Sequence, residues 1–171
     1  MHEWKYMYEM YFDDVYKFLF YLLGNREEAE DLTQDTFIRG FTKRGQFRYQ
    51  SSEKTWFLAI ARNLGIDHIR AKKRLNNFRK ILAKDTIDSE PSPDQLLDLS
   101  EEKKRLYRCL QLLKTPYREV LTLRGIQDLS VKETSLVLNW PESKVTLTFH
   151  RAVKSLREQL GKEEGPENGT E

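Results

Sequence analysis

The sequence lacks the features on which disulfide-stabilised, metal-clustered and membrane-spanning proteins depend. Cys109 is the only cysteine, which excludes an internal disulfide and a cysteine-based metal cluster and fits a reducing compartment. The most apolar run, Phe18 to Gly24, is far shorter than the roughly 20 residues that a membrane span needs. The first residues show no basic segment followed by an apolar one, so no signal peptide is evident. We therefore expect a cytoplasmic protein that is not itself a membrane protein.

Residues that carry enzyme chemistry are also scarce. His2, His68 and His150 lie far apart in the sequence, without partners at metal-ligand spacing, and there is no glycine-rich phosphate-binding loop. Cys109 falls on an apolar helical stripe, where a small core residue is expected. The sequence therefore predicts that the protein is not an enzyme and has no metal site and no cofactor.

Apolar residues recur at helical spacing along most of the chain, whereas strand signals are nearly absent. Val15, Phe18, Leu19 and Leu22 form one such stripe. Gly24 follows it and is placed to end this helix as a C-terminal cap. The pattern predicts an all-helical protein.

A second helix is predicted directly after this glycine. Asn25 followed by Glu28 resembles a capping box, which would open the helix. Its inner face is expected to carry Ala29, Leu32, Thr36, Phe37 and Phe41. The first two helices should then form an antiparallel hairpin.

A polar loop, KRGQFRYQSS, leads into a third predicted helix, for which either Ser51 or Ser52 can be the N-cap. This helix starts with apolar residues, among them Trp56, and continues into a basic run from Arg70 to Lys84. Its first part is therefore expected to pack against the hairpin, and its later part to form an exposed basic surface.

The formal net charge of +2 conceals a segregation of charge, because acidic residues gather between Asp85 and Glu102, directly after the basic run. Residues 82–98 also contain two prolines and no sustained stripe, which is typical of a linker. We expect two small helical domains, residues 1–81 and residues 99–160, joined by this flexible acidic linker. Residues 161–171 are polar and are predicted to be disordered.

The second domain opens with another apolar stripe, formed by Leu106, Cys109, Leu110 and Leu113. Thr115 and Pro116 follow, and they are suited to be the N-cap and first residue of the next helix. Ser130 and Glu133 form a further capping box.

Two short helices separated by a tight turn at Pro141 match the spacing of a DNA-binding helix-turn-helix. By this spacing alone, a plain packing unit is an equal alternative. The last helix is expected to bury Val145, Phe149, Ala152, Val153 and Leu156. Helical geometry then turns Lys144, Leu147, Thr148, Arg151 and Lys154 outward, with Thr146 and His150 at the margins. Arg151 and Lys154 favour DNA binding, because both can meet phosphates or guanine edges.

Three stretches in this order resemble the bacterial extracytoplasmic-function (group IV) sigma factors of the sigma-70 family. They are REEAEDLTQDTFIRGF, FRYQSSEKTWFLAIARNLGIDHIRAKKR and PYREVLTLRGIQDLSVKETSLVLNWPESKVTLTFHRAVKSLREQL. The likeness spans Val15 to Leu160. It implies an alternative sigma factor that binds core RNA polymerase and directs promoter-specific transcription initiation. The first domain would melt and capture the minus-ten element, and the second would read the minus-thirty-five element.

The resemblance assigns a role to the loop and to the third helix. A base that leaves the stack must be held by stacking and by hydrogen bonds. By similarity, the pocket for such a base would be formed by Phe47, Arg48, Tyr49, Gln50 and Ser51, with Asn63 facing the same strand. Nearby phosphates would be held by Arg62, Arg70, Lys72, Lys73 and Arg74. Trp56 is expected to be a core residue, and Phe47 is either a core residue or a base contact.

The resemblance also implies contacts with proteins. The second helix resembles the main polymerase-binding segment, with Glu28, Asp31, Gln34, Asp35 and Arg39 facing the clamp of the largest subunit. A solvated acidic face is the alternative. The second domain would meet the flap of the second-largest subunit. Family members are commonly controlled by a membrane-anchored anti-sigma factor, a partner that nothing in this sequence identifies.

In the helix-turn-helix, the resemblance places base contacts at Leu147, His150 and Arg151, with Arg124, Lys144 and Thr146 nearer the DNA backbone. Family members often carry Lys or Arg where this chain has Thr146 and Thr148, so fewer phosphate contacts are expected. The acidic linker would run toward the polymerase active site, or else be a plain tether. The main alternative function is a conventional helix-turn-helix regulator that binds duplex DNA without being a polymerase subunit. A second is an interaction protein that sequesters a regulator.

Overall fold

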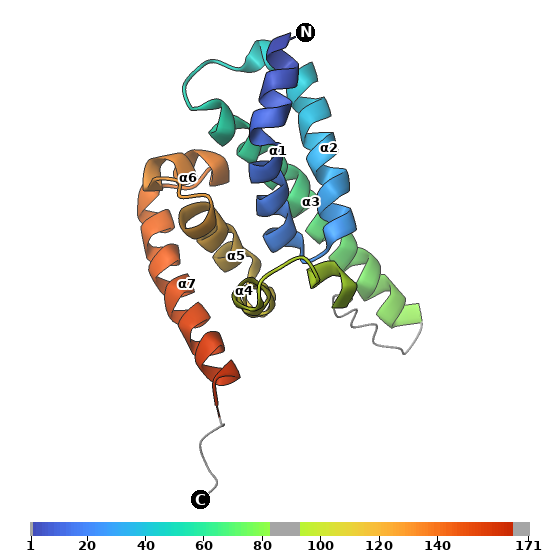
Figure 1. The fold of residues 1–171 in the computed structure, drawn as a ribbon, viewed down its shortest axis with the longest axis vertical. Helices are drawn as coiled ribbons and strands as arrows, with labels where there is room; N and C mark the ends of the chain where they lie inside the picture. The colour runs from blue at the N-terminus through green and yellow to red at the C-terminus, as the bar shows by residue number, and fades with distance from the viewer. Residues whose placement is uncertain (1, 83–92, 166–171) are drawn as a thin grey trace, which may run out of the picture.

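A computed structural model describes residues 2–82 and 93–165, and every regular element in these ranges is helical (Figure 1). The first unit contains α1 (His2–Leu23), α2 (Arg26–Thr42), a short 3-10 turn η1 (Arg44–Gln46) and α3 (Glu53–Leu82). These three α-helices contact one another pairwise. The predicted stripe of α1 is at the centre of their core, since Val15, Phe18, Leu19 and Leu22 are fully buried.

The junction between α1 and α2 follows the prediction in part. Gly24 has a φ of 69°, a left-handed conformation that suits glycine at a helix end. The Asn25 side chain accepts a hydrogen bond from the Glu28 backbone N–H at 3.0 Å, so Asn25 is the N-cap. The reciprocal half of the predicted capping box is absent, because the Glu28 carboxylate accepts a bond from Lys72 Nζ at 2.8 Å instead.

The inner face of α2 differs from the prediction at its last turn. Phe41, which was expected inside, is 53% exposed and rests edge-on against Trp4. Gly40 takes the inner position, and a Cβ added there would lie 2.6 Å from the Phe57 ring. The absent side chain lets α2 approach α3 closely, and this approach turns Phe41 toward solvent.

The substitution Gly40→Ala is expected to destabilise the first unit by about 1–2 kcal/mol. Overpacking a core costs about 1–3 kcal/mol, and the better helix propensity of alanine returns up to about 1 kcal/mol of it. Urea denaturation of both proteins measures the difference. Gly45→Ala is the matched control, since a Cβ at Gly45 meets nothing within 4 Å. Equal stability of the wild type and Gly40→Ala would contradict the close approach.

The second unit contains the remaining described elements. They are a 3-10 turn η2 (Pro93–Leu96), α4 (Glu101–Gln111), α5 (Thr115–Leu121), a π-helical turn η3 (Thr122–Ile126), α6 (Val131–Leu138) and α7 (Glu142–Glu163). The capping box of Ser130 and Glu133 is present with both of its hydrogen bonds. The predicted cap of α5 is wrong by one residue, because Lys114 is the N-cap. Thr115 is the first residue of the helix, and its hydroxyl accepts a bond from the Arg118 guanidinium.

The end of α7 contradicts the predicted start of the disordered tail. The helix continues to Glu163, so residues 161–163 are helical. Arg105 of α4 stabilises this end, because its guanidinium donates to the Leu160 carbonyl at 2.8 Å and lies 2.7 Å from the Glu164 carboxylate. The part of the predicted tail from 166 to 171 lies outside the described residues.

Only the ends of the predicted linker are described, since residues 83–92 lie outside the described ranges. Its last residues are not a free tether. Leu96 is buried, and Gln95 accepts a hydrogen bond from the Arg26 backbone N–H at 3.2 Å. Arg26 also forms an ion pair with Asp98 at 3.2 Å. The second unit therefore attaches to the start of α2 before α4 begins.

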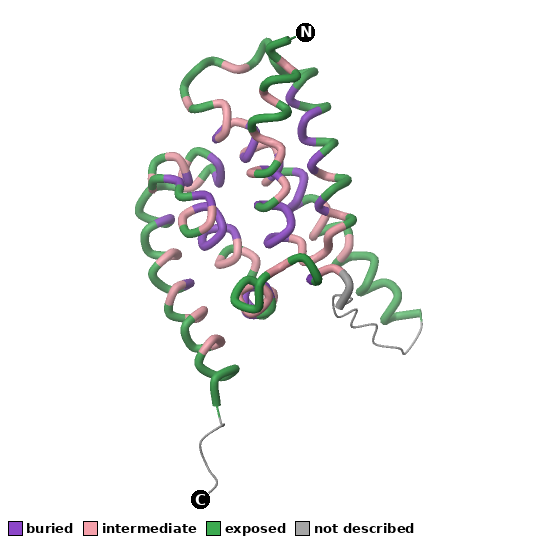
Figure 2. Tube along the Cα trace, in the orientation of Figure 1, coloured by how far each residue is buried: buried purple, intermediate pink, exposed green. Residues whose placement is uncertain are grey.

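The two units pack against each other, an arrangement that the sequence left open. Helix α1 contacts α4, α5 and η3, and α3 contacts α6. Phe20 stacks on Tyr107 with ring centroids 4.8 Å apart, and burial raises the pKa of Tyr107 to about 12. Gln111 and Gln127 donate hydrogen bonds to backbone carbonyls of α1. Figure 2 shows the buried segments of both units facing each other. Across residues 2–82 and 93–165, no helix has the length and apolar character required to cross a membrane.

Candidate nucleic-acid interface

The loop before α3 presents an aromatic cluster. Phe47 is partly buried, with its ring centroid 4.7 Å from that of Tyr49 and 5.1 Å from that of Trp56. Tyr49 is 80% exposed and has a φ of 55°, a left-handed conformation that a tyrosine rarely adopts. Such strain is held in place by the surrounding structure and is common at functional sites.

A small hollow of about 180 Å³ lies among these rings, lined in part by Phe47, Tyr49 and Trp56. Trp56 was predicted to be a core residue, but it is only partly buried and faces this hollow. The remaining loop residues of the predicted pocket lie at the surface, with Arg48 and Gln50 exposed and Ser51 partly exposed. The loop thus offers aromatic faces and polar groups in one place.

Helix α3 begins beside this loop and carries the predicted strand-contacting residues. The Ser52 hydroxyl accepts a hydrogen bond from the Thr55 backbone N–H, so Ser52 is the residue that caps α3. Asn63, Arg70, Lys73 and Arg74 are exposed along the helix. Lys72 is partly exposed and is engaged by Glu28, and His68 Nε2 lies 3.2 Å from the same carboxylate.

Arg62 is set apart from the other predicted phosphate contacts. Its Nε donates to the Glu119 carboxylate of α5 at 2.6 Å, and the two side chains are 18% and 2% exposed. Burial raises the pKa of Glu119, although the bond from Arg62 acts in the opposite direction. Arg62 therefore faces the second unit in this arrangement rather than the exposed basic surface.

The helix-turn-helix consists of α6 and the first part of α7. Asn139 ends α6 in a left-handed conformation with a φ of 54°, and Pro141 precedes the first turn of α7. Val145 and Ala152 of α7 are buried, while Phe149 is partly buried beneath the Arg124 guanidinium, 5.3 Å from its ring centroid. Lys144 Nζ lies 4.1 Å from the centre of the Trp140 ring.

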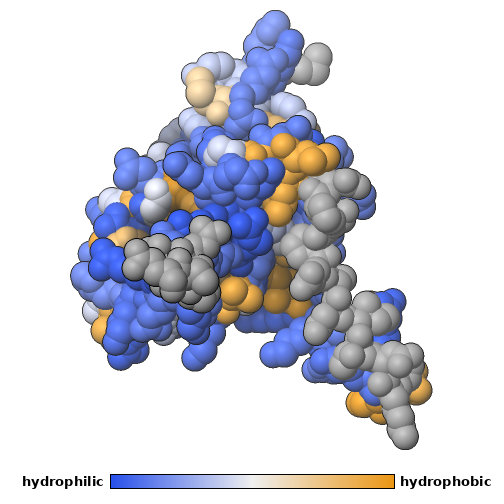
Figure 3. Space-filling view, turned by 60° about the horizontal axis from the view of Figure 1, so that its bottom comes forward, coloured by the Kyte–Doolittle hydropathy of each residue, from blue (hydrophilic) through white to orange (hydrophobic). Residues whose placement is uncertain are grey.

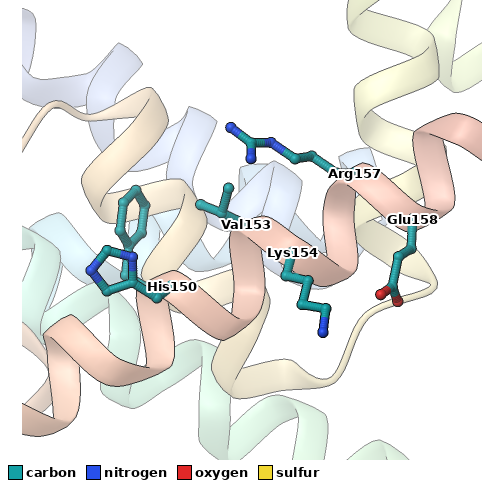
Figure 4. A pocket seen from close by; sticks show the side chains of 6 residues that line it. His150, Val153, Lys154, Arg157 and Glu158 are labelled. Atoms are coloured by element: carbon teal, nitrogen blue, oxygen red, sulfur yellow. The ribbon is translucent and has the colours of Figure 1, made fainter.

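The outer face of α7 brings together most of the predicted duplex contacts. Thr146, Leu147, His150, Arg151 and Lys154 are all exposed, and Thr148 is partly exposed. A shallow hollow of about 490 Å³ runs along this helix, lined by residues from Phe149 to Glu158 (Figure 4). Arg157 lines it with His150 and Lys154, and sequence reasoning missed this cation because it lies one turn beyond the part of the helix compared with DNA-reading positions.

Comparison with known proteins covers both units. A model of Sigma-70 region 2 matches residues 7–75, and a model of Sigma-70, region 4 matches residues 103–156. The ECF RNA polymerase sigma factor SigX of Bacillus subtilis (strain 168) is 36% identical over 160 residues, which cover 90% of this chain and 81% of SigX. The RNA polymerase sigma factor YlaC of the same strain is 32% identical, with 91% of each chain covered.

The chain belongs to the ECF RNA polymerase sigma factors. As a sigma factor it directs transcription initiation through RNA polymerase, and sigma factors are non-catalytic. Two solved structures share its fold. One is RpoE of Bartonella quintana, crystallised with the anti-sigma factor NepR, with a TM-score of 0.78, 21% identity and coverage of 94% of this chain and 98% of that chain. The other is CnrH with the cytosolic domain of CnrY, with a TM-score of 0.71, 19% identity and coverage of 93% and 88%.

The face of α2 predicted to meet polymerase in this sigma factor is more apolar than the sequence indicated. Asp31, Gln34, Asp35 and Arg39 are exposed, whereas Glu28 is partly buried by its partners on α3. Next to the exposed residues lies an open hollow of about 690 Å³ between α1 and α2. It is lined by Trp4, Tyr8, Gln34, Phe37, Ile38, Phe41, Thr42 and Arg44. Ile38 and Phe41 were missed as surface residues, because helical periodicity alone does not show that α2 approaches α3 through Gly40.

Proposed function

We propose that this sigma factor captures the separated minus-ten strand with its first domain and reads the minus-thirty-five duplex with its second. The observation that carries the proposal is the aromatic hollow at Phe47, Tyr49 and Trp56, placed directly before a helix with exposed basic residues. Aromatic faces hold unstacked bases, and neighbouring cations hold the backbone of the same strand. In this proposal, the domains are residues 1–81 and 99–160.

The polymerase-facing surface in this proposal consists of the exposed residues of α2. Asp31, Gln34, Asp35 and Arg39 would meet the clamp of the largest subunit, with the apolar hollow at Ile38 and Phe41 beside them. Glu28 would support this face from the side through Lys72. The second domain would contact the flap of the second-largest subunit. Control by a membrane-anchored anti-sigma factor is part of the same proposal, and the complex of RpoE with the anti-sigma factor NepR supports control by an anti-sigma factor.

Reconstituted transcription tests the proposal against a conventional helix-turn-helix regulator. The purified chain is mixed with core RNA polymerase and promoter fragments recovered from transcript starts after its overexpression. The chain is expected to initiate transcription at these promoters and to bind them tightly only with core polymerase. Tight binding to duplex DNA by the chain alone, with no transcript started by the reconstituted enzyme, would support the regulator instead.

The exposed cations of α7 predict a specific salt dependence for duplex binding. Each phosphate contact contributes a slope of about 0.9 to the fall of log affinity with log salt. In holoenzyme, the double substitution Arg151→Ala and Lys154→Ala is therefore expected to reduce this slope by up to about 1.8. The measurement is promoter binding at several salt concentrations. Lys162→Ala is the matched control, because Lys162 is an exposed cation at the far end of the same helix. Unchanged slopes in the double variant would place the duplex on another surface.

A further inference from the structure

The last turns of α3 project from the body of the protein without packing against it. The buried residues of α3 end at Ile66, and every residue from Lys73 to Leu82 is exposed. In Figure 1 this segment extends past the lower end of α2, and Figure 2 colours it as exposed throughout. An isolated helix shorter than about 12–15 residues is only marginally stable in water. Its stability therefore gains from any partner that covers an apolar face.

Such a face is present, and it is narrow. Ala71, Leu75, Phe78 and Leu82 follow one another at alternating spacings of four and three residues, the repeat of a coiled-coil seam. The three large side chains are 49%, 58% and 70% exposed, and Ile81 beside them is 81% exposed. Figure 3 shows apolar atoms at the tip of this segment, toward the lower right of the view. We refer to Ala71–Leu82 as the α3 tip.

Three of the four positions that flank the seam are basic. If Leu75 and Leu82 are the a positions and Ala71 and Phe78 the d positions, Lys72 and Arg79 fall at e, whereas Arg74 and the apolar Ile81 fall at g. No Asp or Glu occurs in the sequence between Asp67 and Asp85. Flanking e and g residues decide which helix a seam accepts, because opposite charges attract across it and like charges repel.

The basic residues beside the seam indicate which kind of partner can bind it. A second copy of this chain would place cations opposite cations. A lipid surface is favoured by a broad apolar face with interfacial aromatic residues, whereas this seam is one side chain wide over most of its length. We propose that the α3 tip docks an amphipathic helix of a partner protein, with an apolar seam of its own and Glu or Asp at the flanking positions.

The proposal has a consequence for DNA, which rests on the proposed function. Arg70, Lys73 and Arg74 belong both to the α3 tip or its border and to the predicted contacts with the minus-ten strand. A partner helix that brings carboxylates to Arg74 and Arg79 would therefore compete with this strand. Docking at the α3 tip would couple the presence of the partner to the capture of promoter DNA.

A synthetic peptide tests the docking surface without polymerase or DNA. The probe is a 28-residue helix with Leu at the a and d positions and Glu at e and g, and its matched control has Lys at e and g. Fluorescence anisotropy with the full chain is expected to show saturable binding of the Glu peptide and at least tenfold weaker binding of the Lys peptide. Affinity for the Glu peptide should fall as salt is raised.

Variants of the full chain locate the binding. The triple substitution Leu75→Gln, Phe78→Gln and Leu82→Gln is expected to weaken binding of the Glu peptide at least tenfold. Leu112→Gln, which changes a leucine that is 66% exposed on the second unit, should leave it unchanged. The double substitution Arg74→Glu and Arg79→Glu should reverse the preference and select the Lys peptide. Circular dichroism confirms that each variant remains folded.

Three outcomes would overturn the proposal. One is equal binding of the Glu and Lys peptides. Another is that the wild type binds phosphatidylglycerol vesicles, the triple variant does not, and the Glu peptide does not bind the wild type. That result would assign the α3 tip to a membrane surface. The last is self-association in sedimentation that the triple variant loses. If the Glu peptide binds but does not displace single-stranded promoter DNA from holoenzyme, docking stands and the predicted role of α3 in strand capture fails.

Discussion

The substitution Tyr49→Ala is expected to reduce the binding of single-stranded minus-ten DNA by holoenzyme about 5- to 150-fold, because stacking on an aromatic side chain contributes about 1–3 kcal/mol per base. Tyr49 is 80% exposed and leans on Phe47 rather than on the core, so its removal should leave the fold intact. Permanganate footprinting of promoter opening and filter binding of the single strand measure the effect. Duplex binding at the minus-thirty-five element should not change.

Tyr49→Phe is the control for this prediction, since it keeps the aromatic face and removes only the hydroxyl. It should retain most of the single-strand affinity. Phe47→Ala is expected to be as harmful as Tyr49→Ala, because Phe47 lies between Tyr49 and Trp56 and supports both rings. If Tyr49→Ala opens promoters as well as the wild type does, the aromatic hollow is not the site of strand capture.

Substitution of Arg62 by alanine is expected to separate the two units. It leaves the Glu119 carboxylate, which is 2% exposed, without its partner, and removing one member of a buried ion pair costs about 3–5 kcal/mol. The predicted result is a larger radius of gyration in small-angle X-ray scattering, with helix content unchanged. A compact Arg62→Ala protein would show that the remaining contacts between α1 and the second unit suffice.

Glu119→Gln provides the control, because the amide can still accept a bond from Arg62 without a buried charge. Burial raises the pKa of Glu119 in the folded protein above 4.5, its ordinary value. The stabilising contribution of this group is therefore complete below pH 4.5 and is lost as the pH rises through the folded pKa. Urea denaturation at a series of pH values should show the free energy of unfolding of the wild type falling, relative to that of Glu119→Gln, as the pH rises from 4.5 through the folded pKa. A constant difference over pH 4–7 would contradict this sign.

Local signals in the sequence predicted most of the helices correctly. The stripe from Val15 to Leu22 and the capping box of Ser130 depend on neighbours within two turns, and both are present in the structure. Asn25 likewise caps α2, because its side chain needs only the backbone three residues on. Such features follow from helical periodicity and from capping chemistry alone.

The predictions from the sequence fail where distant parts of the chain contact one another. Phe41 turns outward because Gly40 meets the Phe57 ring, a contact that no local pattern of α2 reveals. Trp56 faces a hollow that exists only once the loop folds back over α3. Arg62 has the charge of a phosphate contact, but its partner in this arrangement is Glu119, 57 residues away. Residue type indicates which chemistry is present, whereas long-range packing decides what each group faces.

The length of α7 has a mechanical consequence. Its 22 residues span about 33 Å at a rise of about 1.5 Å per residue, and the predicted DNA-reading side chains end at Lys154, nine residues before the end of the helix. The far end is fastened to Arg105 and Arg108 of α4. A torque applied to α7 in a DNA groove is thus transmitted along a stiff rod to α4, whose Tyr107 rests on Phe20 of α1. Binding of α7 to upstream DNA would therefore strain the contact between Tyr107 and Phe20.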